Sequence, residues 1–168
     1  MSPQRSLPWL LPLVMLAGLT CCAHRDSAQG LEAGTRTSKV QVFVIAPHDS
    51  SAAGRASGCG SAVPLEVDLP APAPALEGAL SALLTLQEGA ETKGLYNALA
   101  HSPLKVDRID RMGPEVRVYL SGYVELGGDC DGPRVLSQLT ETALQFHDLQ
   151  HAQFYLDGKP LQGVLSGK

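Results

Sequence analysis

The chain has 168 residues, a net charge of −4, and a hydrophobic share of 44% against a charged share of 18%. This composition is ordinary for a globular protein and excludes global disorder. The one near-basic cluster (Lys105, Arg108 and Arg111) is interrupted by Asp107 and Asp110. We therefore expect no nucleic acid among the partners.

The N-terminus has the pattern of an export signal. Arg5 precedes an apolar stretch, residues 7–19, whose length of about 13 residues is too short for a bilayer span but typical of a signal-peptide core. The stretch ends in Leu19-Thr20-Cys21-Cys22, which resembles a bacterial lipobox, where a signal peptidase cuts before a cysteine that becomes lipidated. Cys22 fits the lipidated position and Cys21 fits it less well. Cleavage near Ala23 by the ordinary peptidase, with release of a soluble protein, is the alternative.

These features predict an exported protein. Residues 1–22 are expected to be a lipoprotein signal peptide, and residues 23–38, rich in small polar residues, a flexible tether. The expected location is the cell membrane or outer membrane, with the protein facing the periplasm or the cell exterior. No later segment approaches the roughly 18 apolar residues of a second span.

Cys59 and Cys130 are the other two cysteines, and each lies in a glycine-rich segment. In an oxidising envelope such a pair is expected to form a disulfide. The bridge would close a loop of about 70 residues and stabilise the fold by ~4 kcal/mol in the chain-entropy model. Neither cysteine has a histidine close in sequence, so no zinc site is predicted.

The first half of the domain predicts two strands and a helix. Residues 39–46 are β-branched on both faces and predict an inner strand. Residues 48–63 predict a long loop, and residues 64–69 alternate with period 2 and predict a short strand whose opening proline favours an edge. Residues 75–88 predict a helix, because apolar residues recur at helical spacing. They are Leu76, Ala79, Leu80, Leu83 and Leu84.

The second half predicts a hairpin, a helix and a closing strand. Residues 104–112 and 115–120 flank a Gly-Pro turn, residues 133–146 have a helical apolar stripe, and residues 152–156 end at Asp157-Gly158. The tail after Pro160 is expected to be frayed. The predicted fold is a single small α+β domain in the order β-β-α-β-β-α-β, with one mixed sheet and two helices packed on one face.

No catalytic or metal-binding set emerges from the sequence. His147 and His151 have the i, i+4 spacing of a metal pair, but the helix is expected to end before them. Asp129 and Asp131 resemble part of a calcium loop that lacks its other ligands, so Asp131 with Gly132 is expected to cap the following helix. There is no Gly-x-Ser-x-Gly elbow. We expect neither enzyme activity nor a cofactor.

Several stretches in order carry a family resemblance. They are residues 40–44, residues 79–84 followed by Gly94-Leu95-Tyr96, residues 119–122, the run from Gly127-Gly128 to Arg134, the set Gln138, Thr142 and Gln145-Phe146, and residues 155–161. Over residues 39–165 the chain resembles the GerMN domain, the sporulation and spore-germination module of bacterial envelope lipoproteins.

The resemblance implies a fold like the ring-building motifs of sporulation channels, with no known catalytic residues or cofactor. It also implies an anchored envelope protein, some relatives of which join multiprotein assemblies. Gly94, Leu95, Tyr96, Gly127, Gly128, Arg134 and Gln138 are the candidate interaction or structural residues. The chain departs from the family in having His147 where a proline is usual. It also has one domain copy, whereas the spore protein that named the family has two, so spore formation is not implied.

Two functions compete at this point. The first is a lipid-anchored scaffold that binds another envelope protein through an exposed sheet face or edge. The second is a receptor for a cell-wall glycan or small soluble ligand, with the loop before Cys59 and the Gly94-Leu95-Tyr96 turn as its walls. A hydrolase would need a deep pocket with a carboxylate of raised pKa.

We expect Cys22→Ser to abolish lipidation and to move the protein from the detergent phase to the aqueous phase of a Triton X-114 partition. Metabolic labelling with a fatty-acid analogue measures the same loss directly. Cys21→Ser is the matched control and should keep its label. The opposite result, with label lost only in Cys21→Ser, would assign the anchor to Cys21.

Overall fold

The computed structural model describes residues 37–46, 55–56, 59–89, 92 and 94–167, all within one compact unit that spans residues 34–168. The predicted leader with both N-terminal cysteines and residues 23–36 of the predicted tether lie outside the described residues. So do Pro47 and residues 48–54 and 57–58 of the predicted loop. Among the described helices, none is long and apolar enough to cross a membrane.

The described elements are strands and helices in a mixed order. In chain order they are β1 (Thr37–Ala46), β2 (Arg55–Ala56), β3 (Ser61–Pro70), α1 (Ala75–Thr85), β4 (Lys105–Met112), β5 (Glu115–Ser121), α2 (Asp131–Leu144), β6 (His151–Leu156), β7 (Lys159–Pro160) and α3 (Leu161–Leu165). The predicted α+β class is confirmed.

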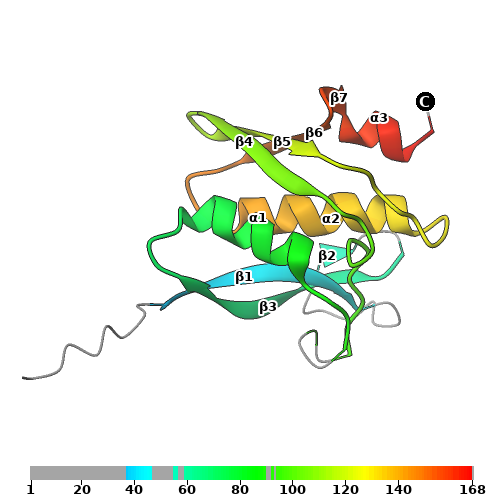
Figure 1. Ribbon diagram of the computed structural model, residues 1–168, viewed down its shortest axis with the longest axis horizontal. Coiled ribbons are helices and arrows are strands. Elements are labelled where there is room, and N and C mark those ends of the chain that lie inside the picture. The colour runs from blue at the N-terminus through cyan, green and yellow to red at the C-terminus, as the bar shows by residue number, and fades with distance from the viewer. Residues whose placement is uncertain (1–36, 47–54, 57–58, 90–91, 93, 168) are drawn as a thin grey trace, which may run out of the picture. The chain divides into compact units, whose positions relative to one another are not determined.

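The strands form two sheets instead of the single mixed sheet that the sequence predicts (Figure 1). One sheet has the order β1-β3-β2 and is antiparallel. The other has the order β4-β5-β6-β7, in which β5 and β6 are parallel and the other pairs antiparallel. Figure 1 shows α1 and α2 between the two sheets. The helices therefore pack on both sheets and not on one face of one sheet.

One core cluster joins both sheets to both helices. Many of its fully buried members come from β1, α1, β5 and α2, and these include Val42, Val44, Leu80, Leu83, Val116, Val118 and Leu139. The alternation of β5, with Val116 and Val118 inward and Arg117 and Tyr119 outward, is the period-2 pattern of a strand with one covered face. At roughly 1.5–3 kcal/mol for each buried aliphatic side chain, this shared core supplies the main driving force for folding.

β3 starts at Ser61, earlier than predicted, and tolerates Pro64 in its interior. Pro64 pairs with Phe43 of β1. The amide and carbonyl of Phe43 both bond to α2, so the Phe43–Pro64 pair exchanges no ladder hydrogen bonds. The missing N–H of proline therefore costs this pairing nothing.

The bounds of both main helices differ from the sequence prediction, and β4 pairs irregularly. α1 ends at Thr85 and not at Glu88, because the Asn97 side chain takes the Leu83 and Leu86 carbonyls and turns the chain away. α2 begins at Asp131, two residues early. The weak alternation of β4 has its reason in a register shift between Val106 and Arg108.

The predicted frayed tail after Pro160 is wrong. Asp157 and Gly158 have positive φ and turn the chain tightly, so that Lys159 pairs with Leu156. α3 follows directly, and Leu161 is fully buried in the core cluster. This single buried leucine anchors the end of the chain.

We expect Gly122→Ala to destabilise the protein by about 2–3 kcal/mol, because alanine at a positive φ is strained. Gly122 has φ +111°, and a Cβ there would lie 2.1 Å from the Pro103 carbonyl oxygen. Gly128→Ala is the control, since a Cβ at Gly128 meets nothing within 4 Å. Urea unfolding measures both. Equal midpoints for the two variants would contradict this account of Gly122.

Candidate functional site

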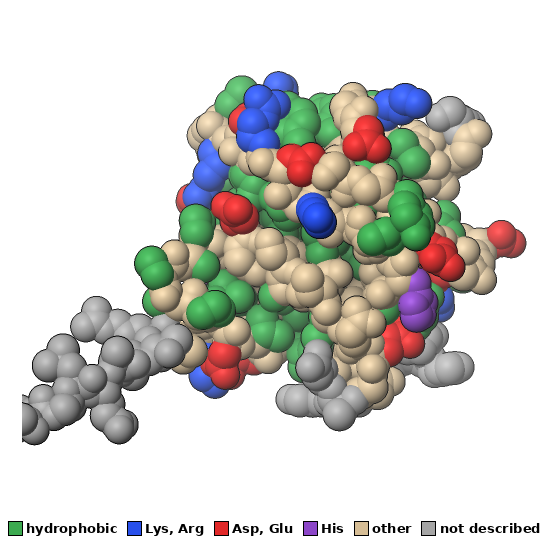
Figure 2. All heavy atoms as spheres, in the orientation of Figure 1, with side chains coloured by type: hydrophobic (Ala, Val, Ile, Leu, Met, Phe, Trp, Pro, Cys, Tyr) green, Lys and Arg blue, Asp and Glu red, His purple; other side chains and the backbone are tan. Residues whose placement is uncertain are grey.

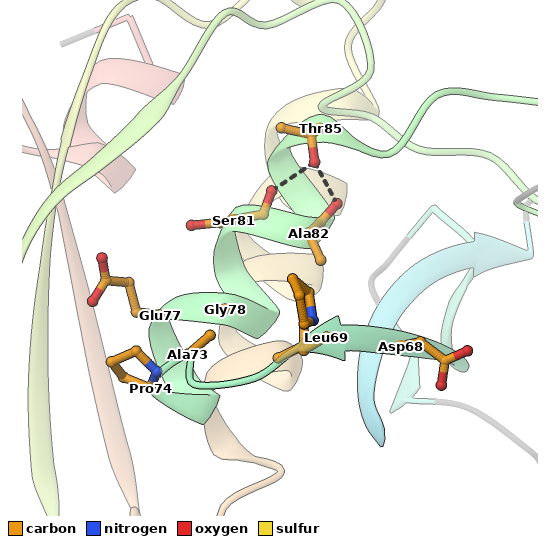
Figure 3. A pocket seen from close by; sticks show the side chains of 10 residues that line it. Asp68, Leu69, Ala73, Pro74, Glu77, Gly78, Ser81, Ala82 and Thr85 are labelled. Carbon is orange, nitrogen blue, oxygen red and sulfur yellow. Dashed lines mark hydrogen bonds between the residues drawn. The ribbon is translucent and has the colours of Figure 1, made fainter. Parts of the chain in front are cut away.

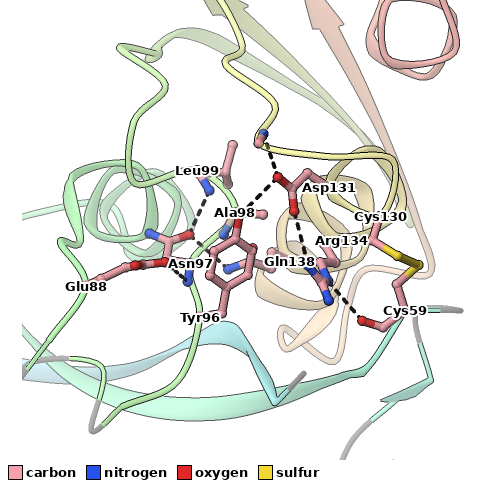
Figure 4. Close-up of polar contacts among 11 residues, drawn as sticks. Cys59, Glu88, Tyr96, Asn97, Ala98, Leu99, Cys130, Asp131, Arg134 and Gln138 are labelled. Carbon is pink, nitrogen blue, oxygen red and sulfur yellow. Dashed lines mark hydrogen bonds and ion pairs between the residues drawn. A yellow bond between two sulfur atoms is a disulfide. The ribbon is translucent and has the colours of Figure 1, made fainter. Parts of the chain in front are cut away.

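The motif residues meet at the start of α2, around the buried carboxylate of Asp131 (Figure 4). Its Oδ2 accepts hydrogen bonds from the Gly127 amide at 2.7 Å and the Tyr96 hydroxyl at 3.0 Å. Its Oδ1 pairs with the Arg134 guanidinium at 3.2 Å. A buried carboxylate requires this number of partners, because an unpaired one costs several kcal/mol.

Asp131 does not have the capping role that the sequence predicts. It is the first residue of α2, whereas Cys130 is the N-cap and makes no side-chain capping bond. Its negative charge does lie near the positive end of the helix dipole, as expected. Its hydrogen bonds, however, tie together three separate segments. A Cβ at Gly127 would lie 3.1 Å from Asp131 Oδ2, a tight contact that would push on the carboxylate.

Arg134 links the Asp131 carboxylate to the cysteine pair. Its Nε donates to the Cys59 carbonyl at 2.9 Å, and its guanidinium lies over the Tyr96 ring at 5.1 Å from the centroid. Cys59 and Cys130 form the disulfide that the sequence predicts, with 5.6 Å between their Cα atoms. The same side chain therefore braces the Cys59 segment, the Tyr96 segment and the helix.

Both the side chain and the backbone of Tyr96 make contacts within the fold. Its amide and carbonyl exchange hydrogen bonds with Ile45 of β1, at 2.8 and 2.7 Å. Burial of the phenol, followed by its hydrogen bond to Asp131, raises the pKa of Tyr96 above the ordinary value for tyrosine. Arg134 covers one face of the ring, so a glycan could not stack on that face without displacing the guanidinium.

Gln138 is a polar residue whose side chain is fully buried. Its Nε2 donates to the Phe43 carbonyl at 2.9 Å and to Asn97 Oδ1 at 3.0 Å, and its Oε1 accepts from the Ala98 amide at 2.9 Å. Asn97, also buried, donates in turn to the Leu83 and Leu86 carbonyls. The pair connects β1, the end of α1, and α2.

Gln138 belongs to a polar stripe on α2 that replaces a neighbouring strand for β1. Thr142 Oγ1 accepts from the Phe43 amide at 3.0 Å. Gln145, just after the helix, accepts from the Gln41 amide at 2.9 Å and donates to the Gln41 carbonyl at 2.6 Å. β1 is therefore an edge strand in the sheet order, although the sequence predicts an inner one.

The other predicted candidates do not assemble into a reactive site. Gly94 has φ +80° and turns the chain into Tyr96, while Leu95 packs against the core. His147 and His151 are both exposed and lie after α2, on a turn and at the start of β6. Within the described residues, no three His, Cys, Asp or Glu side chains gather to hold a metal ion.

A shallow groove of about 420 Å³ lies between the end of β3 and α1 (Figure 3). Leu69, Gly78 and Ala82 contribute its apolar surface. The carboxylates of Asp68 and Glu77 lie at opposite ends of the view, and the Thr85 hydroxyl bonds back to Ser81 and Ala82 carbonyls. The groove offers contact area but no acid and base set to work together.

Sequence reasoning missed Asn97 and the function of the α2 stripe. The available signal was the spacing of Gln138, Thr142 and Gln145 at i, i+4 and i+7, which places three hydrogen-bonding side chains on one helix face. From the sequence alone, a polar stripe of this kind predicts a solvent-exposed helix face. Only the tertiary structure shows that a strand edge lies against it.

The solved structures that are similar to this chain include two of one sporulation protein. The tandem GerMN domains of the sporulation protein GerM from Bacillus subtilis align with a TM-score of 0.55 and 13% identity, covering 79% of this chain and 43% of that one. The first GerMN domain of the same protein aligns with a TM-score of 0.52 and 17% identity, covering 73% of this chain and 85% of that one. This chain thus spans less than half of the tandem structure. No family model and no curated protein matches it.

We expect Gln138→Ala to lower the free energy of unfolding by about 2–4 kcal/mol, because it leaves the buried Phe43 carbonyl and Ala98 amide without partners. Gln162→Ala is the control at an exposed position and should stay within about 0.5 kcal/mol of the parent. Urea denaturation measures both. A Gln138→Ala protein as stable as the control would remove the central role given to Gln138.

Because the pKa of Tyr96 is raised, we expect its contribution to stability to depend on pH in the alkaline range. A folded-state pKa above the unfolded value of about 10 favours folding while the phenol is protonated, and this contribution is lost as pH rises through the folded pKa. The stability advantage of the parent over Tyr96→Phe should therefore be constant below pH 10 and shrink above it. Urea unfolding at pH 8, 10 and 11 tests this, and an unchanged difference would contradict it.

Proposed function

We propose that this chain, whose domain has a GerMN-like fold, is a non-enzymatic, lipid-anchored protein of the bacterial envelope that acts as a scaffold for another envelope protein. The fold is shared with the two GerM structures, and it is this likeness that supports the choice of class. The apolar leader ending in Cys21-Cys22 supports export and anchoring. The Cys59–Cys130 disulfide fits an oxidising compartment outside the cytoplasm.

The observation that carries the proposal is that residues of the family-like motifs form hydrogen bonds that hold the fold together. Asp131, Arg134 and Gln138 form hydrogen bonds to the backbone and side chains of other segments. None of these three points a free acid, base or nucleophile into a pocket. A domain built in this way presents a shaped surface, and binding is the function that such a surface supports best.

The surface charge also favours a protein partner over a polyanion. On the face shown in Figure 2, Lys and Arg side chains gather mainly along the upper margin, with Asp and Glu side chains close to them. Arg108 pairs with Asp110 at 3.3 Å, and Arg111 pairs with Asp148. Interleaved charges of this kind do not create the single-sign field that attracts nucleic acid.

The glycan-receptor alternative depended on Tyr96, whose ring Arg134 covers and whose hydroxyl Asp131 binds. The single tryptophan, Trp9, lies in the predicted leader. The other wall, the loop before Cys59, lies largely outside the described residues. The scaffold is therefore the function that we put forward.

Crosslinking of the full chain in its native envelope, followed by mass spectrometry, tests the proposal. We expect one protein partner to be recovered reproducibly from solubilised membranes, and to be lost when Cys22→Ser removes the anchor. Recovery of no reproducible partner under several mild detergents would reject the scaffold function. Retention of the chain on purified peptidoglycan, equal for the parent and a Tyr96→Ala variant, would point to the wall as a partner through another surface.

A further inference from the structure

The strand edges of the two sheets differ in how well they are closed, within the residues that the structure describes. An open edge presents unpaired backbone amides and carbonyls and can receive an extended peptide as an added strand. The edge of β1 is closed, because the α2 stripe and the Tyr96 backbone bond to it. The two-residue strands β2 and β7 cover only Ser61 and Ala62 of β3 and only Tyr155 and Leu156 of β6. The longer described edges that remain are therefore those of β3, β4 and β6.

The outer edge of β3 is blocked by its own sequence. Gln41 and Phe43 turn their backbone groups toward α2, so their partners Glu66 and Pro64 turn theirs to the outer edge of β3. Pro64 has no amide to donate there. Glu66 adds a charged side chain that forms an ion pair with Lys39. Proline and charge on an edge are standard protection against strand addition.

The outer edge of β4 is protected in a different way. A register shift between Val106 and Arg108 interrupts its regular pairing with β5. The strand also carries charges of both signs, including Lys105, Asp107 and Arg111. Neither a bulge nor a run of charges is a good template for an added strand.

The edge of β6 has neither protection. β7 pairs only with Tyr155 and Leu156, so among the described strands none neighbours residues 151–154 on the side away from β5. The His151 amide donates to the Pro114 carbonyl, just before β5, and the Asp157 amide donates to the Leu120 carbonyl in β5. These two bonds show that the odd-numbered residues of β6 direct their backbone groups toward β5. In a parallel ladder, alternate residues face the same neighbour. Ala152 and Phe154 therefore direct their backbone groups to the open side.

A groove of about 470 Å³ lies along this open edge. Leu136 and Thr140 of α2 form one wall, β6 forms another, and Pro160 and Gln162 close one end. No charged side chain is among its lining residues, in contrast to the charged edges of β3 and β4. An occupant that matches this lining is uncharged where it enters the groove.

We propose that the open edge of β6 over residues 151–154, with this groove, is the docking site for an extended, uncharged peptide segment of a partner protein. The segment adds to the sheet as a strand and bonds to the backbone of Ala152 and Phe154. Its alternate side chains enter the groove beside Leu136 and Phe154, while the others lie on the outer face beside Gln153 and Tyr155. This inference rests on the proposed scaffold function and names the surface that performs it.

Peptides selected from a phage-displayed random library on the purified full chain, held in detergent micelles, test the docking site. We expect selected sequences that alternate apolar and polar residues, lack charge in the central positions, and slow amide exchange at Ala152 and Phe154. Ala152→Pro removes an outward amide that the β5 ladder does not use, and should weaken binding by about tenfold or more. Ala152→Val keeps the amide and should bind like the parent.

Thr140→Arg is a second test that leaves the β6 backbone intact. Its long charged side chain would fill the uncharged groove, so we expect loss of peptide binding, whereas Thr140→Ser should retain it. Binding unchanged in both Ala152→Pro and Thr140→Arg, protection mapped to another element, or no selected peptide would each overturn the proposal. A dimer of this chain that Ala152→Pro dissociates would also overturn it, in favour of a second copy as the occupant.

The two proposals fail separately. A partner captured from the envelope whose binding both variants leave unchanged would keep the scaffold function and remove the β6 site. Peptides that bind the β6 edge without any partner in the envelope would keep the docking site and remove the scaffold function.

Discussion

The edge of β1 is the constraint on which the rest of this domain depends. Backbone amides and carbonyls buried without partners are strongly destabilising, and β1 has a strand on only one side. The side chains of Gln138, Thr142 and Gln145 satisfy the other side in place of a second strand. This arrangement fixes α2 against β1, on the side where a further strand would otherwise pair.

A second set of contacts holds the beginning of α2 in the same way as Gln138 holds its middle. The Asp131 carboxylate is buried and is stable there because two donors and one guanidinium surround it. Arg134 then carries the connection to Cys59, and the disulfide adds a covalent link close by. Electrostatic, aromatic and covalent contacts thus converge on one helical turn. The glycine-rich segment before α2 serves this convergence, since Gly127 leaves room for the carboxylate.

These contacts explain why the family-like motifs leave so little for chemistry. A glutamine that bonds to a backbone carbonyl and a backbone amide has no capacity to bind a ligand as well. The binding function that we propose depends on the surface of the domain, where backbone edges, grooves and charges differ from place to place. Of the described strand edges, the one at β6 is both uncharged and unpaired over several residues. The difference between this edge and the charged edges of β3 and β4 is the basis of the binding site that we propose.

The sequence by itself determined the α+β class, both main helices, the β4–β5 hairpin and the pairing of Cys59 with Cys130. Each depends on local periodicity, on turn residues such as Gly113, or on the small number of cysteines in a chain whose N-terminus predicts export. Only the tertiary structure decided that the strands divide between two sheets, that α1 ends early at Asn97, and that Leu161 anchors the tail. It also decided that Gln138 is buried and that the edge of β6 is open. Those outcomes depend on which segments meet across long separations in sequence. A polar side chain on a helix gives no local signal of whether water or a strand edge will satisfy it.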